Sequence, residues 1–367
     1  MNPCVQLLTR LIASRTDNPG GDEVALCKLL ADELRARDAD LVTTERVPRV
    51  RDGAAAVGAY TFARWGEPRT IINVHIDTVP ANTGWSSDPW TAVVTDDRVT
   101  GLGAADTKGA AAAALIALES ETPRDFGILF SGDEERGGTC IRAFLETDAA
   151  RPVQRAIVCE PTGRVAGIRH RGMTGFRADV QGKGGHSSGA DHMPKPIVTL
   201  ARLAVSLDEL GRTYLERGPD DMKGVCLNVA VLDGGVAFNV VPDRASLTWS
   251  LRPPPGFDVS EWAREVDARV AAAGDDIRVT TLLDHPPFTV DDPAWIQALL
   301  GDRVASLGPL QFWTEAAVLA GAGIDAVVVG PGDIGQAHAA NEFVPIADLD
   351  WAVDLFAHVM RQSRAAD

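Results

Sequence analysis

The chain has 367 residues, of which 45% are hydrophobic and 23% are charged, and its formal net charge at pH 7 is −16. This composition is typical of a globular protein, and the length exceeds the usual size of one domain, so we expect two domains. The negative charge disfavours nucleic acid as a partner, because binding to phosphates requires clustered Lys and Arg.

The cysteine pattern and the hydropathy indicate a cytoplasmic protein. The five cysteines are scattered and include no Cys-x-x-Cys pair, which is typical of reduced thiols in a cytosol. Residues 1–4 are not a basic region leading into an apolar run, so no signal peptide is visible. The alanine run at 110–114 lies in an apolar stretch well below the roughly 20 residues that span a bilayer. We therefore expect a soluble chain with no membrane partner.

Helices and strands alternate in the first part of the chain. Apolar residues at helical spacing predict helices over 5–12 and 26–34, and Asn18-Pro19-Gly20-Gly21 separates them. An alanine-rich helix is expected to run to about residue 118. Runs rich in apolar residues predict strands at 41–47, 55–65, 71–75, 126–130 and 156–159. This order favours an α/β fold, a mostly parallel mixed sheet with helices on both faces.

A different pattern begins after residue 171. It predicts a strand, a helix, two strands, a helix and a strand, at 174–180, 197–210, 225–232, 245–251, 259–270 and 277–283. This βαββαβ order is the ferredoxin-like plan. We therefore predict an inserted α+β domain over 172–286. The first domain, residues 1–171, then resumes over 287–367 with a helix near Trp295, a strand at 325–329 and a last helix from about Leu349.

Acidic residues and histidines follow several of the first domain's strands. They are His75, Asp77, Asp106, Glu134, Glu135 and Glu160, and a late glycine-rich loop adds His338. An isolated His-x-Asp is more often a core histidine beside a turn aspartate. Here, however, the carboxyl ends of parallel strands would gather these groups at one edge of the sheet. Carboxylates gathered there need cations to neutralise them. Two histidines with several carboxylates suit Zn²⁺, with Co²⁺ or Mn²⁺ as alternatives, in an open hydrolytic site.

Five segments, taken in order and spacing, resemble the metal-site motifs of one family. They are His75-Ile76-Asp77, Asp106-Thr107-Lys108-Gly109, Asp133-Glu134-Glu135, Glu160-Pro161-Thr162 and Gln336-Ala337-His338. The family is the di-zinc aminoacylase/carboxypeptidase group that holds acetylornithine deacetylase and succinyl-diaminopimelate desuccinylase. The likeness covers nearly the whole chain. It implies a zinc-exopeptidase-like fold whose inserted domain serves as a lid and dimerisation domain, and hence a homodimer.

The resemblance also implies the role of each residue in these motifs. It implies ligands for two Zn²⁺ ions: Asp106 as the bridge, His75 and Glu160 at one ion, and Glu135 and His338 at the other. Asp77 would orient His75, as metal-bound histidines require. Glu134 would be the general base, since adjacent residues cannot readily aim at one point and so divide into a base and a ligand. It would take a proton from a water between the ions, which leaves a hydroxide there, and pass that proton to the departing amine.

The predicted inserted domain contributes three further candidate site residues. His186 follows Gly182-Lys183-Gly184-Gly185, which is either a glycine-rich turn or, less well matched, a phosphate loop. The resemblance implies that His186 reaches the partner subunit's site and stabilises an oxyanion. Arg252 could bind an α-carboxylate bidentately, with Asn239 beside it. A structural arginine on a strand and an asparagine at a turn remain the alternatives.

The motif details resemble the deacetylases of arginine biosynthesis, and the acetylcitrulline branch in particular. Where the family usually has Arg, this chain has Leu102, which touches no expected ligand. The expected activity is removal of the N-acetyl group from acetylornithine or acetylcitrulline. Glu315 is a candidate partner for an ornithine ammonium, with an N-cap or core-turn role as the alternative. A desuccinylase or dipeptidase/carboxypeptidase remains open. So does a non-catalytic binding protein, which an intact Glu134 disfavours.

Overall fold

The computed structural model describes residues 2–51, 54–274 and 276–363, and the chain divides into two compact units. Unit 1 comprises Met1–Ile168, Val290–Gly308 and Thr314–Asp367, and unit 2 comprises Arg169–Thr289 and Pro309–Trp313. The chain therefore enters and leaves unit 2 close to the expected boundaries at 172 and 286. Residues 309–313, expected in the first domain, belong to unit 2.

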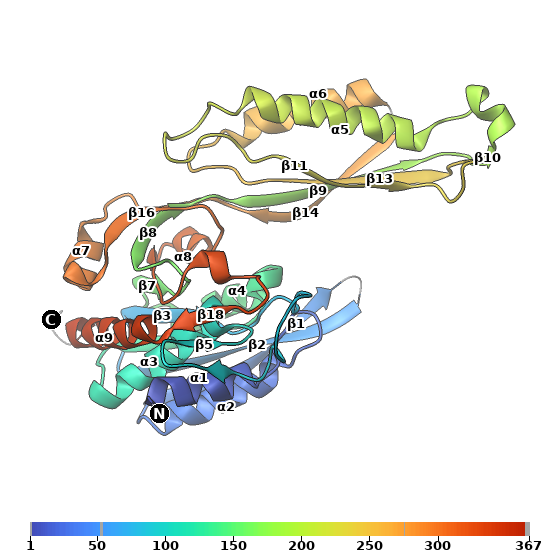
Figure 1. Ribbon diagram of the computed structural model, residues 1–367. Helices are drawn as coiled ribbons and strands as arrows, with labels where there is room; N and C mark the ends of the chain where they lie inside the picture. The colour runs from blue at the N-terminus through green and yellow to red at the C-terminus, as the bar shows by residue number, and fades with distance from the viewer. Residues whose placement is uncertain (1, 52–53, 275, 364–367) are drawn as a thin grey trace. The chain divides into compact units, whose positions relative to one another are not determined.

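The largest sheet in the described residues has nine strands and lies mainly in unit 1 (Figure 1). Its order is β1 (Leu41–Arg51), β2 (Ala54–Trp65), β6 (Phe126–Ser131), β3 (Thr70–His75), β7 (Arg155–Val158), β17 (Asp325–Val328), β8 (Val165–His170) and β15 (Phe288–Thr289), with β16 (Ser306–Leu310) also on β8. The pairings from β6 through β3 and β7 to β17 are parallel. The pairings β1–β2, β2–β6, β17–β8 and β8–β15 are antiparallel. The sheet is therefore mixed, with a parallel centre.

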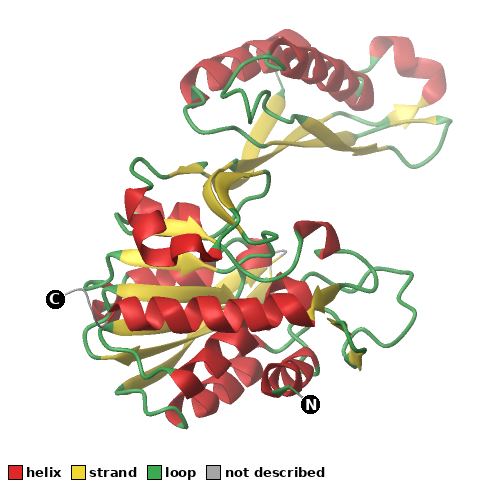
Figure 2. Ribbon diagram, turned by 60° about the vertical axis from the view of Figure 1, so that its left-hand side comes forward, coloured by secondary structure: helices red, strands yellow, loops and turns green. Residues whose placement is uncertain are grey.

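Helices cover both faces of this sheet, as the sequence predicts (Figure 2). One layer consists of α1 (Pro3–Ile12), α2 (Glu23–Arg35), α3 (Gly109–Ser120) and α9 (Ile346–Ser363), with α7 (Ala294–Leu300) against α9. The other layer consists of α4 (Thr139–Leu145) and α8 (Ala316–Gly321). No helix in the described part of the chain has the length and apolar character needed to cross a bilayer.

The central strands determine where the polar residues emerge. Every residue of β3 and β6 is buried, which explains their nearly continuous apolar sequence. In the parallel register His75 lies opposite Ser131, and Asn73 lies opposite Val158. The segments that follow β3, β6 and β7 therefore leave the sheet at the same edge, where open α/β sheets bind ligands.

A small sheet and a short turn complete this edge. The strands β4 (Val93–Val94), β5 (Arg98–Thr100) and β18 (Phe343–Pro345) form a three-stranded sheet. The turn η1 (Ala104–Lys108) follows β5 in the chain and leads directly into α3. Five consecutive alanines of α3 are buried, and their small side chains let the helix approach α1 and α9 closely.

Unit 2 has the predicted ferredoxin-like order. Its elements are β9 (Met173–Gln181), α5 (Pro196–Thr213), β11 (Asn228–Gly234), β13 (Arg244–Leu251), α6 (Val259–Ala273) and β14 (Ile277–His285). The antiparallel sheet order is β11–β13–β9–β14, and α5 and α6 lie together on one face. Apolar side chains of both helices pack on Trp249 in a core separate from that of unit 1. A two-stranded ladder of β10 (Gly185–His186) and β12 (Val240–Val241) extends from this sheet.

Candidate metal centre

The structure brings five of the predicted residues together in unit 1, each from a different segment. His75 is the last residue of β3, Asp106 lies in η1, and Glu160 follows β7. Glu135 lies in the single-turn helix η2 (Glu134–Arg136) after β6. His338 follows another such turn, η6 (Ile334–Gln336). The sheet edge and two loops thus build the site.

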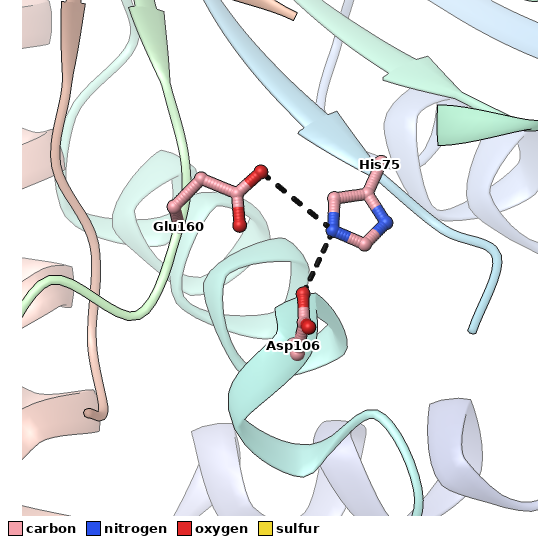
Figure 3. A group of neighbouring side chains, drawn as sticks. All are labelled: His75, Asp106 and Glu160. Atoms are coloured by element: carbon pink, nitrogen blue, oxygen red, sulfur yellow. Dashed lines mark hydrogen bonds and ion pairs between the residues drawn. The ribbon is translucent and has the colours of Figure 1, made fainter. Parts of the chain in front are cut away.

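The five side chains form two trios that share Asp106. In the first, the His75 Nε2 atom lies 2.9 Å from Asp106 Oδ1 and 3.8 Å from Glu160 Oε1 (Figure 3). In the second, the His338 Nε2 atom lies 3.0 Å from Glu135 Oε1 and 3.4 Å from Asp106 Oδ2. Within each trio the ligand atoms lie within 4.8 Å of one another. Such spacing suits an ion that takes nitrogen and oxygen ligands at about 2.0–2.2 Å.

The glutamates at this centre are costly to charge without a cation. Burial raises the pKa of Glu134 and Glu160 well above their ordinary value, and it also raises the pKa of Glu135. The donor set of the two trios, three carboxylates and two imidazoles with no thiolate, suits divalent metal ions.

The two histidines hold a proton more strongly than a free imidazole in the metal-free protein. Burial opposes the charged form of His75, but hydrogen bonds to Asp106 and Asp77 outweigh it and raise its pKa. Hydrogen bonds to Asp106 and Glu135 raise the pKa of His338 to about 10. Metal ions need the neutral imidazoles, so metal binding at this centre would release protons.

Asp77 contacts the site in two ways. Its backbone carbonyl lies 3.1 Å from His75 Nδ1, whereas its nearer carboxylate oxygen lies 3.7 Å away. The imidazole is therefore oriented chiefly by the carbonyl, with Nε2 directed at Asp106. The Asp77 carboxylate instead accepts hydrogen bonds from the backbone N–H groups of Glu134 at 3.0 Å and Glu135 at 3.3 Å. This refines the predicted role of Asp77, because its carboxylate holds the turn that carries both glutamates.

Glu342 is a residue that sequence reasoning left without a role. Its buried carboxylate accepts hydrogen bonds from the backbone N–H groups of Gly103 at 2.9 Å, Ala105 at 2.8 Å and Asp106 at 3.0 Å. It therefore anchors the turn that presents Asp106. Glu342 lies four residues after His338, and this proximity to a candidate ligand was the signal available in the sequence.

Glu315 lies in the core of unit 1 and is only 1% exposed. Its Oε2 atom accepts hydrogen bonds from Asn73 Nδ2 at 2.7 Å and Ser131 Oγ at 2.6 Å. These contacts tie β3 to β6 beneath the metal centre. The candidate role as partner of a substrate ammonium does not fit this enclosure, and the core alternative does.

The three remaining candidates lie in unit 2. His186 is paired with Val240 across the β10–β12 ladder, and the backbone N–H of Ser187 donates to the Asn239 carbonyl at 3.1 Å. Arg252 follows the other end of β13, whose eight residues span roughly 25 Å at about 3.3 Å per residue. The expectation that Asn239 lies beside Arg252 is therefore wrong within one chain, because β13 separates them. Asn239 lies beside His186 instead.

Comparisons with known proteins agree with this geometry. The model of "Peptidase family M20/M25/M40" matches residues 71–362. An N-acetyl-L-citrulline deacetylase of Xanthomonas campestris pv. campestris is 32% identical over 329 residues, which cover 87% of this chain and 88% of that protein. An acetylornithine deacetylase of Myxococcus xanthus is 31% identical, with 75% of each chain covered.

A solved structure shares the fold across the full length. An M20 family metallo-carboxypeptidase from Sulfolobus solfataricus superposes with a TM-score of 0.80 at 16% identity and covers 100% of both chains. The expected zinc-exopeptidase-like fold and the expected family are thus confirmed. The chain belongs to peptidase family M20/M25/M40 and is an amide-hydrolysing enzyme of that family.

Proposed function

We propose that this enzyme removes the N-acetyl group from an N-acetyl-amino acid of arginine biosynthesis, acetylornithine or acetylcitrulline. The observation that carries the proposal is the pair of ligand trios joined by Asp106. This arrangement supports two divalent ions, Zn²⁺ or else Co²⁺ or Mn²⁺. The choice of an acetylated substrate draws support from relatives named for deacetylation of acetylcitrulline and acetylornithine.

In this proposal Glu134 moves the proton. Ions held by the two trios would lower the pKa of a water and polarise the acyl oxygen. Glu134 accepts the proton that the attacking water gives up and donates it to the amine nitrogen as the amide bond breaks. Burial raises the pKa of Glu134, and a higher pKa makes its carboxylate a stronger proton acceptor. The bond from its backbone N–H to Asp77 supports a constant position for this base.

Unit 2 would complete the site in a cytoplasmic homodimer. Arg252 presents a planar guanidinium that suits the substrate α-carboxylate. His186 of one subunit would donate to the oxyanion in the partner's site. Since Asn239 lies beside His186, the two residues would serve the same site. The cysteines are all free thiols, which is consistent with a reducing compartment.

The test is acetate release from acetylornithine and acetylcitrulline by protein loaded with Zn²⁺ or Co²⁺. Glu134→Ala is expected to lower kcat by about 10²- to 10⁴-fold, the range for a lost general base. Its metal content, measured by elemental analysis, should stay at the wild-type level. His186→Ala should lower kcat in the same assay. Absence of turnover on both acetylated substrates would remove the assignment.

A second candidate is a dipeptidase, carboxypeptidase or succinyl-diaminopimelate desuccinylase. The full-length superposition on a metallo-carboxypeptidase favours this alternative at the level of fold. The same substrate panel, extended to dipeptides and succinyl-diaminopimelate, separates the two. Turnover of a dipeptide above that of either acetylated amino acid would favour the second candidate.

A further inference from the structure

The turn that carries Glu134 and Glu135 is short and irregular. It joins the end of β6 to α4, with one helical turn over Glu134–Arg136. Asp133 before it has φ 68°, and Gly137 after it has φ 140°, so the backbone leaves the regular conformations on both sides. Such a segment depends on side chains from elsewhere to hold it in one conformation.

Arg49 of β1 supplies one such contact. Its Nη1 atom lies 2.7 Å from Asp133 Oδ1, and its Nη2 atom lies 2.7 Å from Glu23 Oε1. The side chains of Arg49, Glu23 and Asp133 are 8%, 4% and 3% exposed. The guanidinium therefore joins α2, β1 and the start of the turn in an enclosed place, where charge-assisted hydrogen bonds are strong and directional.

Glu23, the other partner of Arg49, is also connected to the turn by hydrogen bonds. Asn18 Nδ2 donates to Glu23 Oε1 at 3.2 Å and to Asp77 Oδ2 at 2.9 Å. The Asp77 carboxylate accepts the backbone N–H groups of Glu134 and Glu135. Arg49 thus acts on Asp133 directly and on the next two residues through a connected chain of hydrogen bonds.

Two glycines provide room for the side chains of Arg49 and Glu23, because a side chain at either position would collide with them. A Cβ atom at Gly58 of β2 would lie 2.7 Å from Arg49 Nη1 and 2.6 Å from Cys140 Sγ. A Cβ atom at Gly132 would lie 2.1 Å from Glu23 Oε2. A side chain at Gly58 would force the guanidinium and the Cys140 thiol to shift, because a distance below 3.0 Å is not a normal contact for Cβ.

We propose that Arg49 is a positioning residue that sets the placement of Glu134 and Glu135 through Asp133 and through Glu23, Asn18 and Asp77. Its side-chain partners are Glu23 and Asp133, and neither of them is a candidate metal ligand. The proposal rests on the proposed function in taking Glu134 as the base and Glu135 as a ligand. It has an asymmetric consequence: Arg49 contacts directly the start of the turn that carries Glu135, whereas His75 and Glu160 lie on other segments and Asp106 is shared by both trios.

The test compares metal affinity and kinetics in Arg49→Met, Arg49→Lys and Gly58→Ala, with Arg46→Met as the control. Arg46 lies on the same strand but is exposed. Metal-stripped proteins are titrated with Co²⁺ by calorimetry, and the two binding steps are compared with those of the wild type. Arg49→Met is expected to weaken one step by about 10- to 100-fold, as loss of a residue supporting a ligand does, and to leave the other within about twofold.

The kinetic readout separates positioning from a general loss of structure. In Arg49→Met, kcat is expected to fall by about 10- to 100-fold with little change in KM, because a displaced base weakens the transition state rather than substrate binding. Arg49→Lys, which keeps the charge but not the planar fork, should recover part of the loss. Gly58→Ala should shift both readouts in the same direction as Arg49→Met, and Arg46→Met should match the wild type.

Three outcomes would overturn the proposal. One is wild-type metal binding and kcat in Arg49→Met. Another is an equal weakening of both binding steps with a lowered thermal midpoint, which would make Arg49 a fold-stabilising residue. If Arg49→Met does not fold, wild-type behaviour of Gly58→Ala is decisive against it. A wild-type protein that binds Co²⁺ but hydrolyses no amide would contradict only the proposed function. The effect of Arg49→Met on Co²⁺ binding would still test the positioning role of Arg49.

Discussion

Glu315 and Glu342 are two enclosed carboxyl groups near the metal centre that face different donors. Burial raises the pKa of each to about 7. Backbone N–H groups occupy both oxygens of Glu342. Glu315 uses only Oε2, and its buried Oε1 has no hydrogen-bond partner. A glutamine amide can therefore replace the Glu315 carboxyl, whereas at Glu342 its NH₂ group would face another donor.

Glu315→Gln should change how stability depends on pH in the metal-free protein. The pKa of Glu315 is about 7 in the folded state, against an ordinary value of 4.5. Between these values the folded state holds one proton more than the unfolded state. The contribution of Glu315 to the free energy of unfolding is therefore fully present below about pH 4.5 and is lost as the pH rises through 7. From pH 5 to pH 8 the wild type should lose on the order of 3 kcal/mol relative to Glu315→Gln.

Urea unfolding with excess chelator at each pH measures this difference. Glu45→Gln, an exposed substitution on β1, is the control and should follow the wild type. Parallel pH profiles for Glu315→Gln and the wild type would show that Glu315 does not hold a proton in the folded state.

At the scale of elements, α3 is built for close approach. Ala110–Ala114 are at most 1% exposed. A Cβ atom at Gly109 would lie 3.2 Å from Leu349 Cδ2 of α9, so little free space separates these helices. Helices packed this closely tolerate little added volume.

Ala113→Leu should destabilise unit 1 by about 1–3 kcal/mol, the usual cost of forcing extra methylene groups into a well-packed core. Ser120→Leu introduces the same side chain at an exposed position of the same helix and is the matched control. Thermal unfolding followed by circular dichroism measures both. Equal midpoints for the two variants would show that the core around α3 accommodates a larger side chain at Ala113, contrary to this prediction.

At the scale of the whole molecule, the metal centre belongs to one unit only. Its ligands join β3, β6, β7, η1 and the loop after η6, all in unit 1. Unit 2 has its own core around Trp249 and Leu203. Ion binding should therefore stabilise the segments that carry ligands without acting on the interior of unit 2.

Chelation should raise amide hydrogen exchange in residues 103–109, 132–138 and 334–341. Exchange in β9 and β13 should stay unchanged, because their hydrogen bonds depend on the unit 2 core. Mass spectrometry of peptides from holo and chelated protein measures this, and re-addition of Zn²⁺ serves as the control. An equal increase in β9 would show that the two units respond as one.

Much of this architecture was open to prediction because it rests on local patterns. A buried strand such as β3 and an amphipathic helix such as α5 are recognised from apolar spacing over a few residues. The order of the motifs from His75 to His338 predicted which side chains converge, since parallel strands present their carboxyl ends at one edge. The sequence alone therefore determined the α/β class and the ferredoxin-like insert, and it identified the residues that meet in the candidate metal centre.

Only the tertiary structure decided which residues support that centre. Arg49, Glu315 and Glu342 make their contacts with segments far away in the chain, and no local period or motif encodes such a partner. The position of Asn239 beside His186 was likewise decided by strand pairing. The physical reason is that a hydrogen bond requires two groups to meet in space. For groups far apart in the chain, that meeting depends on the packing of the whole unit.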